Sequence, residues 1–417
     1  MQFIIQGGRK LKGSIRVNGS KNAGLPLLSA ALLTGRNVTL NNIPDIADIQ
    51  SSIKLMQSLG ARAEFENHTV KIKSGQLSSS VLNEEIAKKM RASIFFTVPV
   101  LARLKSVTFP HPGGCVIGER PIDIFTEGYR AFGAIVAHTQ KSYTVTVDQL
   151  RGTRFVFPIV SVAATENLMM LATVAQGDST LVNAAMEPEI TALADFLNSC
   201  GAHIEGAGTA VITIRGGTHY ESDPDAFQNI PDRLEAGSLI ILGVAANAEL
   251  EITDLDPRHL DVLFLYLKKM DAQLEIGTNS VRTLVHDDLT VINIKTHEYP
   301  GFPTDLQSPM VVLMTQAQGQ GIVHETIFEG RMAWAEDLKR MGANILPLDN
   351  FRIAITGPTP LHGRMTESLD IRAGMAYLIA GLIASGTSTI NDIEKIDRGY
   401  ERLEERLRAV GADIKRI

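Results

Sequence analysis

The sequence predicts an α/β protein built from six α+β repeats, grouped as two lobes of three repeats each. Three observations support this fold class: a phrase that recurs at the ends of expected helices, a strand phrase between its copies, and the chain length. A chain of 417 residues is expected to form two or three domains at roughly 100 to 200 residues each. A single unit of about 70 residues buries its apolar faces poorly, so we expect the repeats to share cores.

The first phrase reads apolar-Gly-Ala-x-apolar and predicts the end of a helix followed by the start of a strand. Glycine is the usual residue in the left-handed position after a helix, and aspartate tolerates that conformation. The copies are spaced by about 70 residues, a regularity that indicates an internal repeat. The six positions are Gly60, Gly133, Gly201, Asp271, Gly342 and Gly411.

The second phrase is a strand that leads into a polar loop, and its residues alternate as in a half-buried strand. The six copies lie at 37–40, 106–109, 179–182, 250–253, 322–325 and 387–390. Polar crossovers at Ser20 and at 229–232 predict two lobes with a cleft between them. One lobe is expected to comprise residues 1–18 and 229–417, and the other residues 19–228.

Composition excludes several classes of protein. No window approaches the roughly 18 apolar residues of a membrane helix, and the first residues lack the features of a signal peptide. We therefore expect a soluble, cytoplasmic protein without membrane contact. The formal net charge of −6 argues against broad nucleic-acid binding. Cys115 and Cys200 are too few for a disulfide framework or a cysteine-rich zinc site.

Four cations stand at expected loop-to-helix junctions, where the helix dipole disfavours positive charge. They are Lys21, Arg120, Arg331 and Arg398. Several cations at related junctions indicate helix ends and side chains aimed at one phosphate or carboxylate. The alternative is that each long side chain bends outward into solvent.

A loop at 109–121 contains two prolines, three glycines and Cys115 before its final Pro121. It is too irregular for a helix or strand and has the composition of a lid. A thiol beside Arg120 and a helix start ionises more easily than a free cysteine. The alternative is an inert apolar filler, which is the interpretation we favour for Cys200. His111 is expected to be a polar loop residue.

These residues together resemble the enolpyruvyl transferases that act on UDP-N-acetylglucosamine. The similarity runs through essentially the whole chain and is closest at 19–23, 90–93, 112–115, 302–305 and 397–401. The resemblance implies that each lobe is an inside-out α/β barrel of three repeats.

The resemblance also implies a reaction. The 3′-hydroxyl of UDP-N-acetylglucosamine adds to C2 of phosphoenolpyruvate, C3 receives a proton, and phosphate leaves from a tetrahedral intermediate. This would be the first committed step of peptidoglycan precursor synthesis, on which cell-wall biogenesis, cell shape and cell division depend. No cofactor and no metal is implied, and the oligomeric state stays open.

A donor with a phosphate and a carboxylate requires a cationic pocket. By the resemblance, Lys21, Arg120 and Arg398 surround the phosphate. Arg331 and Arg372 surround the carboxylate, although a guanidinium can serve both groups. Asn22 is expected to orient the donor.

Cys115 matches the family's proton donor, which also forms a covalent adduct with phosphoenolpyruvate, so both roles stay open. The resemblance further implies that the epoxide fosfomycin alkylates it. Asp305 matches the acceptor of the sugar hydroxyl proton, with a helix cap as the alternative.

The remaining implied residues hold the UDP-sugar. Arg91 could instead be a solvated surface charge, and Asp370 could form a structural ion pair with Arg372. The full set implied for substrate binding, beyond those above, is Arg91, Arg120, Pro121, Ile122, Asp123, Ile124, Ser161, Val162, Asp305, Ile327 and Asp370.

Three other functions compete with this one. A transferase acting on shikimate 3-phosphate would share the fold and the donor, and the 112–115 segment argues against it. A non-catalytic paralogue that binds UDP-sugars should lack a reactive side chain. An RNA 3′-phosphate cyclase-like protein should have a basic groove, which the acidic balance disfavours.

Overall fold

The structure is a computed structural model that describes residues 1–111, 113, 122–221 and 223–417. The chain divides into two compact units. One contains residues 1–18 and 231–417, and the other contains the described residues between 19 and 230. The crossings lie at 18/19 and 230/231, beside the expected 18/19 and 228/229.

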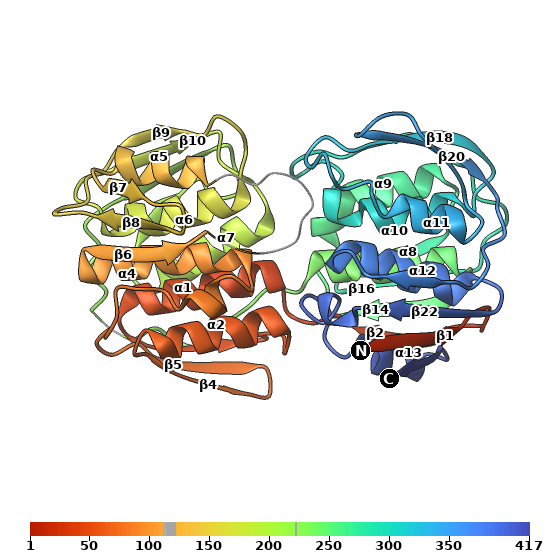
Figure 1. Ribbon diagram of the computed structural model, residues 1–417, viewed down its shortest axis with the longest axis horizontal. Helices are drawn as coiled ribbons and strands as arrows, with labels where there is room; N and C mark the ends of the chain where they lie inside the picture. Colours follow the sequence, from red (N-terminus) through yellow and green to blue (C-terminus); the bar gives the residue numbers. More distant parts are fainter. Residues whose placement is uncertain (112, 114–121, 222) are drawn as a thin grey trace. The chain divides into compact units, whose positions relative to one another are not determined.

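In the unit that begins at Gly19, three helices form the centre and sheets surround them (Figure 1). The inner helices are α1 (Lys21–Thr34), α4 (Thr97–Leu104), which continues the 3-10 helix η1 (Arg91–Phe96), and α6 (Val162–Val174). In α1 every residue from Ala23 to Thr34 is buried, as expected for a helix that is apolar on all sides.

Three sheets cover this centre, in the strand orders β13-β3-β5-β4, β6-β8-β7 and β11-β12-β10-β9. Their strands are β3 (Asn37–Asn41), β4 (Arg62–Glu66), β5 (Thr69–Lys73), β6 (Ser106–Pro110), β7 (Ile135–His138), β8 (Ser142–Thr146), β9 (Arg154–Val156), β10 (Ser179–Val182), β11 (His203–Glu205), β12 (Val211–Arg215) and β13 (Phe227–Gln228). The outer helices are α2 (Ala47–Ser58), α3 (Glu84–Ala87), α5 (Asp123–Ala131) and α7 (Pro188–Ser199).

The other unit repeats this plan around α8 (Arg233–Ala245), α10 (Gln307–Met314) and α12 (Ile371–Ile383). Its sheets have the orders β15-β16-β14-β2, β17-β18-β20-β19 and β21-β22-β1-β23. The strands are β1 (Gln2–Gln6), β2 (Lys12–Arg16), β14 (Glu249–Thr253), β15 (Leu274–Ile276), β16 (Ser280–Thr283), β17 (Ile294–Lys295), β18 (Gly319–His324), β19 (Asn344–Pro347), β20 (Arg352–Gly357), β21 (Met365–Glu367), β22 (Thr387–Asn391) and β23 (Asp413–Arg416).

The other helices of this unit lie outside the central three. They are η2 (Pro257–Leu260), α9 (Asp261–Lys269), η3 (Thr304–Leu306), α11 (Ala335–Arg340), η4 (Ile393–Lys395) and α13 (Leu403–Ala409). Helices inside and sheets outside, three repeats to a unit, confirm the predicted fold class.

The amino-terminal strands explain why this unit is discontinuous in sequence. β1 lies in the middle of its sheet, antiparallel to both β22 and β23, and buries Phe3 and Ile5. β2 runs parallel to β14. Residues 1–18 therefore complete two sheets whose other strands lie between residues 249 and 416.

The helix-end phrase is confirmed at all six positions. Gly60, Gly133, Gly201, Asp271, Gly342 and Gly411 have positive φ angles between 70° and 114°. They follow the carboxyl ends of α2, α5, α7, α9, α11 and α13. A strand begins two or three residues later each time, so the phrase joins a helix to a strand as predicted.

The strand phrase is also confirmed, because its six copies form β3, β6, β10, β14, β18 and β22. Each pairs antiparallel with a neighbour in its own sheet. In β3 the buried Val38 and Leu40 lie opposite the buried Ile72 and Val70, so one face of the sheet packs on the inner helices.

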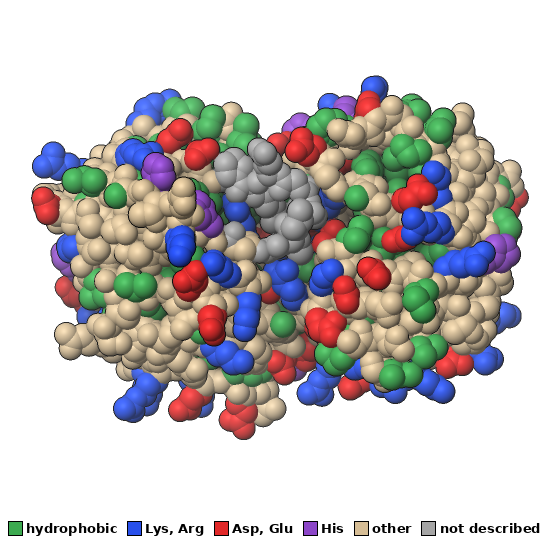
Figure 2. Space-filling view, in the orientation of Figure 1, with side chains coloured by type: hydrophobic (Ala, Val, Ile, Leu, Met, Phe, Trp, Pro, Cys, Tyr) green, Lys and Arg blue, Asp and Glu red, His purple; other side chains and the backbone are tan. Residues whose placement is uncertain are grey.

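The surface is mixed in charge. On the face seen in Figure 2, Lys and Arg side chains alternate with Asp and Glu side chains over both units. No helix in the described part of the chain combines the length and apolar character needed to cross a bilayer.

Candidate active site

Asp305 lies between two buried arginines at the start of α10. Its Oδ1 accepts from the Arg331 guanidinium at 2.7 Å, and its Oδ2 accepts from the Arg372 guanidinium at 2.9 Å. The Arg331 and Arg372 side chains are only 4% and 7% exposed, whereas Asp305 is 24% exposed. The carboxylate is thus fixed by charged hydrogen bonds and still reaches solvent.

The arginines determine the ionisation of this carboxyl group. Burial by itself would raise the pKa of Asp305, but the charges of Arg372 and Arg331 outweigh that and hold the pKa well below its usual range. Asp305 is therefore an ionised acceptor throughout the neutral range. Neither η3 nor α10 has a side-chain cap, so the alternative of a capping role is not what the structure shows.

Two helix amino termini meet beside this carboxylate. Ser308, in the first turn of α10, donates to the backbone oxygen of Arg372 at the start of α12, at 3.0 Å. The first N–H groups of α12 are capped by Asp370, so what the two helix ends add to this region is the positive ends of their dipoles. Together with the two guanidinium groups, they make this part of the unit suited to an anion.

Tyr400 is a buried partner of Arg372 that the sequence analysis left without a role. Its hydroxyl lies 3.1 Å from the Arg372 guanidinium and 3.2 Å from Ser238 Oγ. The guanidinium of Arg372 thus donates one hydrogen bond to Tyr400 and another to Asp305, and the two bonds together fix its orientation. In the sequence, a role for Tyr400 was indicated only by its position in the 397–401 segment, one of the segments on which the family resemblance rests.

Asp370 is the amino-terminal cap of α12. Its Oδ1 accepts from the backbone N–H groups of Arg372 and Ala373, at 2.7 and 3.1 Å. The Arg372 guanidinium bonds to Asp305 and Tyr400 instead. The alternative of a structural ion pair between Asp370 and Arg372 is therefore wrong, because the cap turns the carboxylate toward the helix backbone.

In the unit that begins at Gly19, Lys21 is the first residue of α1. Ser20 caps this helix by accepting from the Ala23 N–H at 3.2 Å. The Lys21 ammonium lies 3.3 Å from Asp48 Oδ2, and these side chains are 12% and 6% exposed. The predicted cation at this helix start is thus largely buried and does not bend outward into solvent.

The other implied residues of this unit stand at helix starts. Arg91 opens η1 and is half-buried; Ser161 caps α6, and Val162 begins it. The start of α5 is formed by its cap Ile122, which is buried, and by Asp123 and Ile124. Asn22 is half-buried in the first turn of α1.

Two predicted helix starts are wrong. Arg331 lies in a turn, and α11 begins four residues later at Ala335. Arg398 also lies in a turn, because Arg402 adopts a left-handed φ of 40° and α13 begins at Leu403. Both arginines therefore lie in loops, and the Arg331 guanidinium reaches Asp305 from its loop.

Cys115, Arg120 and Pro121 lie outside the described residues. The structure brings together Asp305, Arg331 and Arg372 in one unit, and Ile327 and Arg398 belong to the same unit. Lys21, Asn22, Arg91, Ser161 and Val162 belong to the other unit.

Cys200 is the buried, inert cysteine that the sequence predicted. It follows α7, is 6% exposed, and its burial raises the pKa of the thiol to about 11. A neutral thiol of this kind is a poor nucleophile.

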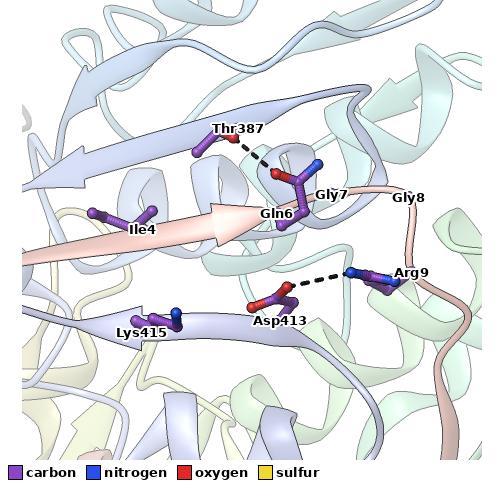
Figure 3. A pocket seen from close by; sticks show the side chains of 8 residues that line it. All are labelled: Ile4, Gln6, Gly7, Gly8, Arg9, Thr387, Asp413 and Lys415. Atoms are coloured by element: carbon purple, nitrogen blue, oxygen red, sulfur yellow. Dashed lines mark hydrogen bonds and ion pairs between the residues drawn. The ribbon is translucent and has the colours of Figure 1, made fainter.

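A hollow on the outer face of the sheet β21-β22-β1-β23 lies away from these residues (Figure 3). Thr387 bonds to Gln6 across it, and Arg9 lies 3.6 Å from Asp413. It is open and is lined by none of the implied site residues.

Comparison with known proteins defines the class. The family model described as EPSP synthase (3-phosphoshikimate 1-carboxyvinyltransferase) matches residues 5–407. The solved structure of the enolpyruvyl transferase NikO from Streptomyces tendae has a TM-score of 0.90 at 23% identity and covers 99% of this chain and 98% of that one. EPSP synthase from Acinetobacter baumannii has a TM-score of 0.76 at 18% identity, with 100% of both chains covered. The fold and the match are those of the enolpyruvyl transferases, which are enzymes.

Relatives of higher identity specify the branch. A UDP-N-acetylglucosamine 1-carboxyvinyltransferase of Desulfosudis oleivorans is 40% identical over 416 residues, covering 100% of this chain and 99% of that protein. The enzyme of the same name from Nitratiruptor sp. is 38% identical and both chains are covered completely. UDP-N-acetylglucosamine 1-carboxyvinyltransferase 2 of Listeria monocytogenes is 38% identical, with 100% and 97% covered. The chain belongs to the UDP-N-acetylglucosamine 1-carboxyvinyltransferase family.

Proposed function

We propose that this chain transfers the enolpyruvyl group of phosphoenolpyruvate to the 3′-hydroxyl of UDP-N-acetylglucosamine and releases phosphate. The observation that supports it most is the buried Arg331–Asp305–Arg372 cluster in a chain whose full-length relatives have that name. The reaction supplies a peptidoglycan precursor in the cytoplasm, and cell-wall growth and division depend on it.

In the addition step, Asp305 accepts the proton of the sugar hydroxyl as the oxygen attacks C2 of phosphoenolpyruvate. The flanking arginines keep this carboxylate ionised, although they also weaken it as a base. Proton transfer therefore accompanies formation of the C–O bond, when the hydroxyl becomes more acidic. The Cys115 thiol delivers a proton to C3, and a tetrahedral intermediate forms.

In the elimination step, C3 returns a proton to the Cys115 thiolate, the double bond forms again, and phosphate leaves with the proton that Asp305 had accepted. Lys21, Arg120 and Arg398 stabilise the departing phosphate. Arg331 and Arg372 bind the carboxylate of the donor. A guanidinium has five N–H donors, and the bonds to Thr304, Asp305 and Tyr400 leave donors on both arginines for this purpose.

UDP-N-acetylglucosamine is held by Arg91, Ser161 and Val162 and by the turn that contains Ile327. The start of α5, at Ile122, Asp123 and Ile124, adds backbone and side-chain contacts, with Arg120 and Pro121 preceding it. Asn22 orients the donor, and Asp370 acts by capping the helix that presents Arg372.

The test is phosphate release by the purified protein, measured with phosphoenolpyruvate alone and with each acceptor. Release is expected only when UDP-N-acetylglucosamine is added, and Cys115→Ser should lower kcat by at least about 100-fold, as for loss of a general acid. Cys200→Ala is the matched control, because that thiol is buried away from the site.

Turnover with shikimate 3-phosphate and none with the UDP-sugar would assign the chain to the EPSP synthases that the family model also covers. Binding of the UDP-sugar with no phosphate release from any acceptor would favour a non-catalytic paralogue.

A further inference from the structure

Glu325, directly after β18, is a carboxylate with no exposed surface. Burial of a charge is costly unless hydrogen bonds replace the water that it loses. Among the described residues, the hydrogen-bond partners of Glu325 are neutral donors and include no cation. Because an apolar side chain could fill this space at lower energetic cost, a carboxylate at this position indicates a specific role for its hydrogen bonds.

Four donors surround the carboxylate of Glu325. Oε1 accepts from Thr296 Oγ1 at 3.1 Å and from the backbone N–H groups of Ile327 and Phe328 at 2.8 and 3.3 Å. Oε2 accepts from Thr304 Oγ1 at 2.7 Å. An ionised carboxylate only accepts hydrogen bonds, so it satisfies all four donors at once.

Two of these bonds lead to Arg331. Thr304 gives its single hydroxyl proton to Glu325, which leaves its oxygen as the acceptor for the Arg331 guanidinium at 3.0 Å. Phe328, whose N–H is held by Glu325, places its ring 5.4 Å from the guanidinium carbon of the same arginine. Glu325 thus orients both groups that Arg331 contacts besides Asp305.

We propose that Glu325 is a positioning residue, which sets the guanidinium of Arg331 for the carboxylate of phosphoenolpyruvate. This role rests on the function proposed above. Glu325 acts through the proton direction of Thr304 and through the backbone of the 325–328 turn. It touches no substrate itself.

The substitution Glu325→Gln should distinguish the bond to the Thr304 hydroxyl from the bonds to the backbone N–H groups of the 325–328 turn. Three donors converge on the Oε1 position, two of them backbone N–H groups, so the amide oxygen of glutamine takes that position. The amide NH2 then faces Thr304, whose hydroxyl proton must turn away. The turn is retained, and the acceptor that faces Arg331 is disturbed.

The expected result for Glu325→Gln is a split between the two substrates. The KM for phosphoenolpyruvate should rise about tenfold, the usual effect of disturbing a hydrogen bond to a charged group. The KM for UDP-N-acetylglucosamine should change by less than about twofold, because the Ile327 turn is kept. General destabilisation would reduce the amount of active enzyme and leave both KM values unchanged.

Thr304 provides a second route to the same link. Thr304→Val removes the hydroxyl and should raise the KM for phosphoenolpyruvate at least as much as Glu325→Gln does. Thr304→Ser keeps the hydroxyl and should have a KM close to that of the wild type. The double variant Glu325→Gln with Thr304→Val should resemble Thr304→Val alone, since both changes break one connection. Thr283→Val is the matched control: Thr283 is a buried threonine of the same unit that bonds to the backbone of Ala248 and Leu250.

The wild-type enzyme is assayed first with both substrates. Absence of turnover there would overturn the proposed function and this inference with it. Wild-type turnover with an unchanged KM for phosphoenolpyruvate in Glu325→Gln and Thr304→Val would overturn the inference alone. Equal effects in Thr283→Val would also overturn it, because they would show that any buried threonine of this unit matters as much.

Discussion

At the scale of single residues, the central feature of the Asp305 cluster is a carboxylate shared by two arginines. Removing Asp305 would leave Arg331 and Arg372 close together and uncompensated, which is costly for buried charges. Because the pKa of Asp305 lies below its usual range, its ionisation stabilises the fold above the unfolded pKa of about 3.9. That stability is lost only as the pH falls toward the folded pKa, so Asp305 causes no change in charge near neutral pH.

The two cysteines should differ in reactivity toward fosfomycin. With UDP-N-acetylglucosamine present, we expect one covalent adduct per chain, at Cys115, because the Cys200 thiol is buried and its pKa is raised to about 11. Intact-mass analysis followed by peptide mapping measures this. Cys200→Ala should still take one adduct and Cys115→Ser none. An unmodified wild-type chain would contradict an accessible thiolate at Cys115.

Glu166 in α6 should make stability depend on pH. It is 1% exposed, its Oε1 has no hydrogen-bond partner among the residues that the structure describes, and burial together with Glu189 and Glu187 raises its pKa well above the usual value. A raised pKa contributes stability that is complete below the unfolded pKa of about 4.3 and is lost as the pH rises through the folded pKa.

We therefore expect Glu166→Gln, which cannot ionise, to gain stability relative to the wild type as the pH rises. The difference in Tm between the variant and the wild type should grow by a few degrees between about pH 5 and pH 9, since about 1 kcal/mol corresponds to roughly 2 to 4 °C in a cooperative unit of about 200 residues. Thermal unfolding at the two pH values measures it. A difference that stays constant or shrinks would contradict the raised pKa.

At the scale of elements, the helix ends depend on left-handed residues. Gly201 has φ of 102° and open space where a Cβ would lie, whereas a Cβ at Gly60, also at φ of 102°, would lie 3.0 Å from the Ser78 backbone nitrogen. Gly201→Ala should cost about 1 kcal/mol, the backbone term alone. Gly60→Ala should lower the free energy of unfolding by more than this, because the backbone at Ser78 must also move to make room for the new Cβ.

The measurement is the free energy of unfolding of the two variants in urea. Gly177→Ala, in a loop at φ of 88° with nothing near its Cβ position, is the matched control and should behave as Gly201→Ala does. Equal losses at Gly60 and Gly201 would show that the contact with Ser78 has no effect on stability.

At the scale of the whole chain, each unit closes its own core around three inner helices. One core contains only residues between Ala23 and Tyr220. The other contains residues from Phe3 to Val17 and from Leu234 to Ile414. Residues 19–230 expressed alone should therefore fold and show a cooperative urea transition.

A fragment of residues 19–150 lacks α6, one of the three inner helices, and should show no cooperative transition. Circular dichroism and urea titration compare the two fragments. Similar behaviour of both would mean that the inner trio is not the unit of folding.

Much of the fold could be predicted because its signals are local. A left-handed residue after a helix and alternation along a strand each depend on a few neighbouring residues, so Gly60 through Gly411 and the six strand phrases were visible in the sequence. The helix starts at Arg331 and Arg398 were mispredicted, since turns at 329–334 and 396–402 intervene. Nothing local in those segments marks where the helix begins.

The partners of the site residues could not be predicted in this way. Asp305 binds arginines that lie 26 and 67 positions away in sequence, and Glu325 holds Thr304 across 21 positions. Such contacts exist only after three repeats share one core and bring the starts of α10 and α12 side by side. The amino-acid order thus specifies the repeated elements and the residue types, whereas the packing of distant segments specifies which side chains meet.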